Sequence, residues 1–206
     1  MDGRHFVIEC NSVWRNQRNQ SMYCKQLGSG PDVVLLHGWG WHAGVWDDVA
    51  RRLASEFRVW LPDLLGHGRR RARSADLSLD GLVDLVCSGV PEAAAWIGWS
   101  LGGLVALRAA RAGVAHRVVL VGTTPRFVQD TDWKHGLPRK WFRDFTEELA
   151  HDAERAFERF ASLHLAGNGN ERSLLRRLRR ESEFAKQSGG ACPWPTRACS
   201  SPRSAS

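Results

Sequence analysis

Short apolar runs alternate with stretches of helical periodicity through the middle of the chain. The runs of strand length are residues 33–36, 57–61, 94–98 and 117–122, and each ends at or just before a glycine or proline. Between them, residues 46–56, 79–87 and 101–112 carry apolar side chains three and four positions apart, which predicts amphipathic helices. Because parallel strands need long crossover connections, the alternation predicts an α/β fold, a mostly parallel sheet with helices on both faces.

The pattern changes toward both ends of the chain. Residues 1–21 include a polar stretch without periodicity and predict a poorly ordered extension, with Met22 as an alternative start. Residues 22–130 are the expected core, and the helical spacing within residues 131–187 predicts a helical cap. Residues 188–206 are rich in Pro and Ser without any period, so we expect a disordered tail that reads like translation in a wrong frame.

Composition narrows the possible classes of protein. In 206 residues, no apolar run approaches the ~20 residues of a membrane span, and the first residues lack a signal-peptide pattern, so a cytoplasmic protein is expected. We also expect a monomer, although no sequence feature fixes the oligomeric state. The five cysteines are odd in number and scattered, which predicts free thiols, with no disulfide framework and no metal site. The net charge of +7 favours an acidic partner.

Gly98-Trp99-Ser100-Leu101-Gly102 matches the pattern of a nucleophile elbow, in which a serine occupies a strained turn from a strand into a helix. An apolar run precedes it and a predicted helix follows, as this turn requires. Ser100 is therefore the candidate nucleophile. The alternative is a serine that only caps the helix.

A second glycine-rich segment follows the first predicted parallel strand. His37-Gly38-Trp39-Gly40 would bring a backbone N–H toward an oxyanion formed at Ser100, with Trp39 and Leu101 as the expected donors. The alternative is an ordinary β-to-α loop whose glycines only allow a tight turn.

The chain resembles the α/β-hydrolase superfamily in these two motifs. It also does so in Val45-Trp46, in the extended elbow through Ala106 and in Glu158-Arg159-Phe160. Within this superfamily the chain is similar to the pimeloyl-[acyl-carrier protein] methyl ester esterases of biotin synthesis, from about Met22 to Lys186. The resemblance implies a carboxylesterase without a cofactor that uses Ser100 as nucleophile and Trp39 and Leu101 as oxyanion donors. It also implies a substrate channel lined by Phe160, Ala161, Ser162, Leu163 and His164, although that family often has glutamine where His164 stands.

The resemblance further implies an acidic acyl carrier protein as the partner. Arginines of the predicted cap would hold it, namely Arg155, Arg159, Arg172 and Arg176. A solvated helix face is the alternative explanation for these arginines. No nucleic-acid partner is expected, because no stacking platform or groove-reading motif accompanies Arg176, Arg177, Arg179 and Arg180.

An elbow serine also needs an acid and then a histidine later in the chain. The histidines after Ser100 are His116, His135, His151 and His164, and none follows a late apolar run. Asp130 and Asp132 follow the fourth predicted strand, but no histidine partner can be assigned to them. We therefore expect the last strands of the fold to be missing through truncation or frame shift, which would leave an open sheet edge and impaired catalysis.

Two other functions remain open from the sequence. The chain could be a catalytically impaired fragment that only binds an acidic acyl carrier or an acyl ligand. It could also be an α/β hydrolase for another small ester, because the elbow is shared and only the cap differs.

Overall fold

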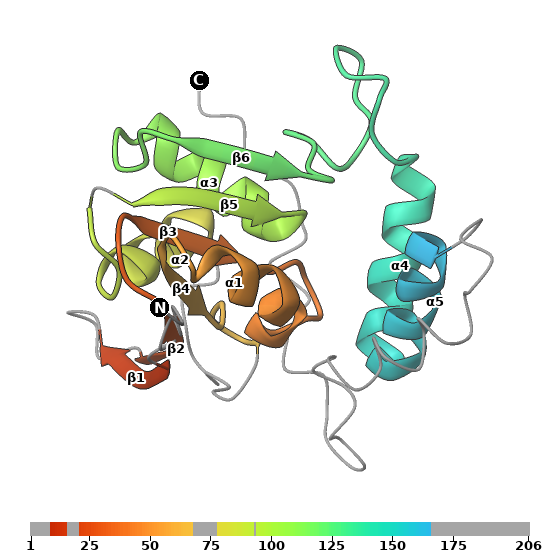
Figure 1. Ribbon diagram of the computed structural model, residues 1–206. Helices are drawn as coiled ribbons and strands as arrows, with labels where there is room; N and C mark the ends of the chain where they lie inside the picture. Colours follow the sequence, from red (N-terminus) through yellow and green to blue (C-terminus); the bar gives the residue numbers. More distant parts are fainter. Residues whose placement is uncertain (1–8, 16–20, 68–77, 93, 166–206) are drawn as a thin grey trace. The chain divides into compact units, whose positions relative to one another are not determined.

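The computed structural model describes residues 9–15, 21–67, 78–92 and 94–165. The described residues divide into two compact units, which meet in sequence between Pro125 and Arg126 (Figure 1). This division lies a few residues before the predicted start of the cap. The predicted tail, residues 188–206, lies outside the described residues.

The first unit contains a six-stranded sheet in the order β1-β2-β4-β3-β5-β6. Strands β3 to β6 run parallel, whereas β1 pairs antiparallel with β2 and β2 pairs antiparallel with β4. Their bounds are β1 Glu9–Arg15, β2 Ser21–Leu27, β3 Asp32–Leu36, β4 Arg58–Pro62, β5 Ala95–Trp99 and β6 Val118–Val121. The four parallel strands are those expected from the apolar runs.

Strand β1 corrects one expectation from the sequence. Glu9–Arg15 was expected inside a poorly ordered extension, and this is wrong because the segment pairs with β2 along its whole length. Strand β2 was not predicted either, although Met22 and Cys24 are buried and Tyr23 and Lys25 are less so. That period of two is the signal of a strand with one buried face.

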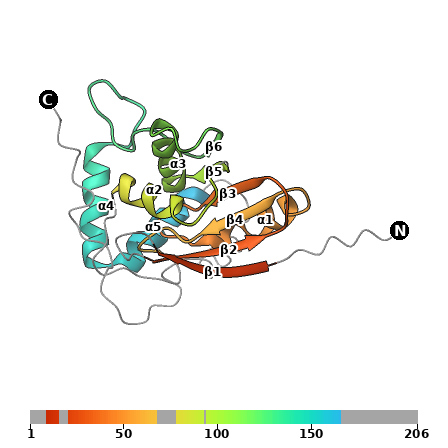
Figure 2. The same ribbon diagram turned by 90° about the vertical axis from the view of Figure 1, so that its left-hand side faces the viewer.

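Alternation along the central strands builds a core on each face of the sheet. Val34 and Leu36 pack with α2 and α3, whereas Val33 and Leu35 pack with α1. The helices of this unit are α1 Asp47–Leu53, preceded by the short 3-10 helix η1 Ala43–Trp46, α2 Leu79–Cys87 and α3 Leu101–Arg111. Figures 1 and 2 show α1 on one face of the sheet and α2 and α3 on the other. The predicted two-faced α/β architecture is confirmed.

Strand β6 forms one edge of this sheet. In the described part of the chain it pairs with β5 alone, and Figure 1 shows it at the rim. Val119, Leu120 and Val121 are 53%, 44% and 42% exposed. Because neighbouring strand residues face opposite sides, the described residues leave side chains of β6 partly exposed on both faces of the sheet at this edge.

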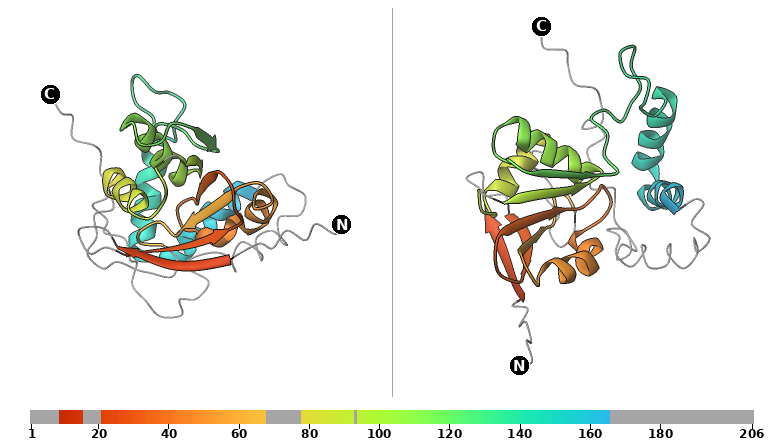
Figure 3. Two further views of the ribbon diagram at one scale, coloured as in Figure 1. Left: turned by 60° about the vertical axis from the view of Figure 1, so that its left-hand side comes forward. Right: turned by 45° about the horizontal axis from the view of Figure 1, so that its top comes forward.

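The second unit is a pair of helices, α4 Arg139–His151 and α5 Ala153–Leu165, preceded by a looped segment (Figure 3). Phe145 of α4 and Phe160 of α5 pack with ring centroids 5.7 Å apart. Between the helices, the Asp152 carboxylate accepts a hydrogen bond from the N–H of Arg155 at 3.0 Å, which caps the start of α5. Two helices thus lie within the range for which the sequence predicts a helical cap.

Other features bear on the class of protein. No described helix combines the length and the apolar character that a membrane crossing demands. Within the described ranges, no cluster of three or more His, Cys, Asp or Glu side chains could hold a metal ion. Cys24 and Cys87 are thiols, and burial raises the pKa of Cys24 to about 12, so that this thiol stays protonated.

Candidate active site

Ser100 occupies the turn between β5 and α3. Its φ of 54° and ψ of −114° are unfavourable for a residue with a side chain, and no other non-glycine residue in the described ranges has a positive φ. Such a conformation costs about 1–3 kcal/mol and persists only where the surroundings enforce it. Ser100 therefore has the strained backbone that the elbow motif predicts.

Close backbone contacts explain the two glycines that flank Ser100. A Cβ atom on Gly98 would lie 2.3 Å from the carbonyl oxygen of Gly102, and one on Gly102 would lie 2.3 Å from that of Leu36. Neither oxygen can move without displacing the first turn of α3 or the end of β3. The spacing in the motif thus follows from tight packing of a helix start against two strand ends.

The N-terminus of α3 points its first amides toward this turn. The carbonyl of Ser100 accepts hydrogen bonds from Gly103 N–H at 3.0 Å and Leu104 N–H at 3.2 Å. The N–H of Leu101, the residue after Ser100, has no acceptor inside the helix, as at any helix start. This end of the helix carries partial positive charge, so a negative charge that forms beside it is stabilised.

The loop after β3 reaches the same turn. A Cβ atom on Gly38 would lie 3.4 Å from the Cβ of Ser100 and 3.3 Å from the ring of Trp99, so the backbone of this loop passes directly beside Ser100. Gly40 has a φ of 78°, and Trp41 N–H donates to the carbonyl of Gly38 at 3.3 Å, which turns the loop back. Trp39 lies within this turn and is half-buried.

His37 fixes the start of that loop. Its Nε2 accepts a hydrogen bond from Leu64 N–H at 2.9 Å, and its Nδ1 lies 2.8 Å from the carbonyl oxygen of Gly38. An Nδ1–H tautomer satisfies both contacts, because one nitrogen accepts and the other donates. Complete burial lowers the pKa of His37 to about 4, so the ring is neutral near pH 7. Both ring nitrogens of His37 therefore face backbone partners.

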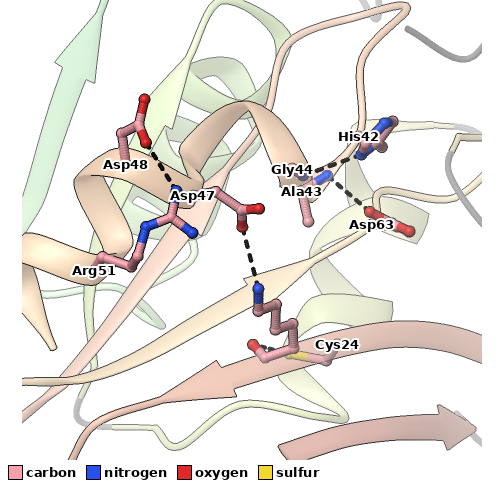
Figure 4. A network of polar contacts seen from close by, with 9 residues as sticks. Cys24, His42, Ala43, Gly44, Asp47, Asp48, Arg51 and Asp63 are labelled. Atoms are coloured by element: carbon pink, nitrogen blue, oxygen red, sulfur yellow. Dashed lines mark hydrogen bonds and ion pairs between the residues drawn. The ribbon is translucent and has the colours of Figure 1, made fainter. Parts of the chain in front are cut away.

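The loop after β4 contacts the start of η1, which follows the loop at Gly38. The Asp63 carboxylate accepts a hydrogen bond from Ala43 N–H at 2.8 Å, and His42 Nδ1 accepts one from Gly44 N–H at 3.0 Å (Figure 4). Both contacts fix the start of η1. Buried His67 packs edge-on against His37 with centroids 5.2 Å apart, and burial lowers its pKa well below the usual range. These polar side chains link the loops after β3 and β4.

The sequence analysis did not predict that His37 joins the loops after β3 and β4, and it assigned no role to Asp63 or His67. A signal was available, because Asp63 and His67 follow a strand that is parallel to β3 and β5. The carboxyl ends of parallel strands meet at one edge of a sheet, where ligand sites of open α/β sheets form.

Aromatic rings border the serine. Trp41 and Trp99 lie with centroids 5.7 Å apart, and a Cβ atom on Gly122 would lie 3.5 Å from the Trp99 ring. Ser100 itself is only 6% exposed. Ser100 is thus buried near two tryptophan rings, where polar interactions are stronger than in water.

None of the described histidines forms a hydrogen bond with Ser100. His116 lies between α3 and β6, before the strand and therefore at the sheet edge opposite to Ser100. His135 and His151 belong to the second unit. For His164 only the helical backbone is described.

The two aspartates considered as acids form exposed ion pairs in the second unit. Asp130 lies 2.8 Å from Arg139, and Asp132 lies 2.5 Å from Arg126. A backbone hydrogen bond from Thr131 and the Arg139 side chain lower the pKa of Asp130. Both carboxylates are thus occupied by arginines.

The predicted channel residues lie on α5. Phe160 is half-buried against Phe145, Ala161 is buried, and Leu163 is 56% exposed. The hydroxyl of Ser162 donates to the carbonyl of Glu158 at 2.7 Å. Leu163 therefore presents the largest apolar surface of this segment.

The predicted carrier-binding arginines are divided between described and other residues. Arg159 lies 2.9 Å from Glu148 and 5.8 Å from the centroid of the Trp141 ring. Arg155 lies 3.6 Å from the same carboxylate, and its side chain is 77% exposed. Arg159 thus has a role within the helix pair, while Arg155 projects into solvent. Arg172 and Arg176 lie outside the described residues, as do Arg177, Arg179 and Arg180.

The elbow, its glycines and the adjoining loop agree with a comparison against known families. Residues 33–201 match the model of the alpha/beta hydrolase family. The chain belongs to this family.

Curated relatives within the alpha/beta hydrolases include proteins named pimeloyl-[acyl-carrier protein] methyl ester esterase. The protein from Stenotrophomonas maltophilia (strain R551-3) is 41% identical over 159 residues, which are 77% of this chain and 61% of the relative. The protein from Xanthomonas oryzae pv. oryzae (strain MAFF 311018) is 42% identical over 159 residues, which are 77% of this chain and 62% of the relative. The chain thus spans about three fifths of the length of these relatives.

Solved structures show the same fold at low sequence identity. A bromoperoxidase from Bacillus anthracis superposes with a TM-score of 0.74 at 21% identity, covering 89% of this chain and 70% of that protein. An esterase from Exiguobacterium antarcticum has a TM-score of 0.71 at 17% identity, covering 84% and 69%. The shared feature is the alpha/beta hydrolase fold.

Proposed function

We propose that this chain is the nucleophile-bearing part of a carboxylic ester hydrolase that cleaves the methyl ester of a pimeloyl chain on acyl carrier protein. The observation that carries the proposal is the strained backbone of Ser100 at the N-terminus of α3, beside the loop at Gly38. The relatives at 40–42% identity bear the name of this activity, and this name supplies the substrate.

In the proposed reaction the Oγ of Ser100 attacks the ester carbonyl. A bond forms between Oγ and the carbonyl carbon, and the carbonyl oxygen becomes an oxyanion. We assign the N–H groups of Leu101 and Trp39 as its donors, because one begins α3 and the other follows Gly38 beside Ser100. The C–O bond to the methoxy group then breaks, and methanol leaves with the proton that came from Oγ. Water hydrolyses the acyl-serine to the free carboxylate.

The proton of Oγ must pass to a base. His37 is unsuited to this, because its two ring nitrogens already bond to the backbone of residues 38 and 64 and its pKa is about 4. We assign to the described chain the nucleophile and the oxyanion donors, and no base. The chemistry of ester hydrolysis requires neither metal nor cofactor.

The cap is proposed to bind the carrier and its acyl chain. Arg155 and Arg159, with Arg172 and Arg176, would attract the acidic carrier, and residues 160–164 would border the acyl chain. The 77% exposure of the Arg155 side chain and the exposed face of Leu163 support this division of roles.

Labelling with a fluorophosphonate tests the proposed nucleophile. The probe should label the wild-type chain and the Ser55→Ala variant, slowly because no base is assigned to the described chain, but not Ser100→Ala. Ser55 is a suitable control because its exposed hydroxyl donates only to the carbonyl of Arg52. Folding of each variant is checked by circular dichroism. A folded wild-type chain that shows no labelling dependent on Ser100 contradicts the hydrolase and favours a protein that only binds its acyl ligand.

The ester substrate needs a separate comparison. Hydrolysis of a pimeloyl methyl ester on acyl carrier protein should exceed hydrolysis of p-nitrophenyl acetate in kcat/KM. Equal values for the two esters would contradict the carrier-bound substrate and favour a hydrolase of other small esters.

A further inference from the structure

We propose that Thr123 is a positioning residue for the elbow: its hydroxyl holds the carbonyl of Ser100 and thereby aims the N–H of Leu101 at the oxyanion. This inference rests on the proposed function of Ser100. It concerns a residue that lies outside the elbow motif and 23 positions after the nucleophile.

The end of β6 bonds to both backbone polar groups of Ser100. Ser100 N–H donates to the carbonyl of Val121 at 3.0 Å. Gly122 then turns the chain with a φ of 51°, and the hydroxyl of Thr123 lies 3.2 Å from the carbonyl oxygen of Ser100. The same hydroxyl lies 3.1 Å from the carbonyl oxygen of Val121. Strand β6 thus clamps the residue whose backbone is strained.

Because the peptide bond is planar, the contact of Thr123 with the Ser100 carbonyl also restrains the N–H of Leu101. The carbonyl of Ser100 and the N–H of Leu101 belong to one rigid peptide unit, in which they point in opposite directions. A hydroxyl that restrains the oxygen therefore restrains the direction of the N–H. Because Leu101 N–H is a proposed oxyanion donor, Thr123 acts on catalysis through this peptide without touching the substrate.

Packing around Gly103 supports the contact between Thr123 and the Ser100 carbonyl. A Cβ atom on Gly103 would lie 1.9 Å from Oγ1 of Thr123 and 2.8 Å from its Cβ. The second glycine after Leu101 therefore makes room for the threonine against the first turn of α3. The elbow and the end of β6 fit together at this point, and the hydroxyl is held between the carbonyls of Ser100 and Val121.

The test compares Thr123→Val, which removes the hydroxyl at nearly constant volume, with Thr123→Ser, which keeps it. Thr146→Val is the matched control, because the hydroxyl of Thr146 also donates to a carbonyl, that of Arg143 in α4. Fluorophosphonate labelling is resolved into probe affinity and the rate constant of covalent reaction. Loss of one hydrogen bond should lower the rate constant about three- to tenfold in Thr123→Val. Probe affinity should be unchanged, and Thr123→Ser and Thr146→Val should react like the wild type.

A second measurement is independent of reactivity. Amide hydrogen exchange at Ser100 and Leu101 should become faster in Thr123→Val than in Thr123→Ser, while exchange in β3 stays unchanged. Equal exchange in the two variants, or equal labelling rates, overturns the role of Thr123. If the wild-type chain shows no labelling dependent on Ser100, the proposed function fails, and the exchange rates still decide whether Thr123 restrains the elbow.

Discussion

His37 Nε2 accepts a hydrogen bond from Leu64 N–H at 2.9 Å, so that a side chain at the end of β3 fixes the loop after β4. The same ring lies 2.8 Å from the carbonyl oxygen of Gly38 through Nδ1. His37 therefore couples the loop that passes beside Ser100 to its neighbour. The arrangement requires a neutral ring, because a protonated Nε2 cannot accept a hydrogen bond.

Stability should consequently depend on pH through His37. Burial lowers the pKa of His37 from 6.5 in the unfolded chain to about 4 in the folded one. Between these values the unfolded chain binds more protons, so the free energy of unfolding decreases as pH falls. The loss should begin near pH 6.5 and reach about 3 kcal/mol below pH 4.

Urea unfolding between pH 7.5 and pH 4 measures this dependence. The His37→Gln variant keeps an acceptor for Leu64 N–H and does not titrate, so its stability should decline less steeply over the same range. Buried His67, whose pKa is also lowered, and the carboxylates should preserve part of the slope. Identical slopes in the two proteins would show that His37 does not titrate as described.

Replacement of Ser100 by glycine should stabilise the fold. Glycine adopts a φ of 54° without the penalty of about 1–2 kcal/mol that a side chain incurs, although its greater freedom in the unfolded chain offsets part of the gain. Ser100→Ala is the matched control, since it also lacks the hydroxyl but keeps a Cβ atom. In urea unfolding, the free energy of unfolding of Ser100→Gly should exceed that of Ser100→Ala by about 0.5–1 kcal/mol. The reverse order would mean that this turn is unstrained.

Gly102 should tolerate no side chain. A Cβ atom there would lie 2.3 Å from the carbonyl oxygen of Leu36, within the backbone of a central strand, so Gly102→Ala should lose more than about 3 kcal/mol or fail to fold. Gly113→Ala provides the comparison, because Gly113 has a φ of 75° but a Cβ atom added there would meet no other atom within 4 Å. The free energy of unfolding of this control should fall by about 1–2 kcal/mol from backbone strain alone. Thermal or urea unfolding of both variants measures the difference, and equal losses would exclude the close contact as the cause.

Charge variants of the cap separate carrier binding from structure. Arg155→Glu should weaken binding of an acidic acyl carrier protein about two- to fivefold at low salt, with little effect at high salt. Glu148→Gln should not weaken it, because removal of this carboxylate frees Arg155 and Arg159 from their ion pairs. Arg51→Glu, at an exposed pair with Asp48 in the first unit, changes the net charge equally and is the control. Fluorescence anisotropy of labelled carrier measures the affinities, and equal effects of Arg155→Glu and Arg51→Glu would exclude a specific cap surface.

Local patterns account for the parts of the fold that were predicted correctly. Helix α2 spans Leu79–Cys87 as expected, because its apolar spacing and the Ser78 cap both lie within one short segment. The elbow was also predictable, since its five-residue pattern is local, although the close contact that Gly102 allows is with distant Leu36.

Contacts between distant residues explain what the sequence did not reveal. Strand β1 contains few apolar residues, and its structure depends on pairing with β2. The bond from Leu64 to His37 joins positions 27 residues apart, and no local pattern marks such a pair. The pairing of Arg159 with Glu148 likewise depends on how α4 packs against α5, so a cationic side chain expected to bind a carrier also has a partner within the cap.

The exposed side chains of strand β6 affect the amount of soluble protein that a cell can maintain. Three successive aliphatic residues at a sheet edge offer the kind of segment that chaperones bind and that other chains join as an added strand. Wherever this edge stays as exposed as it is among the described residues, proteolysis and holdase capture at Val119–Val121 should lower the abundance of the chain in addition to global unfolding. Replacing Leu120 by lysine should raise the soluble yield, since a charge on an edge strand opposes such association.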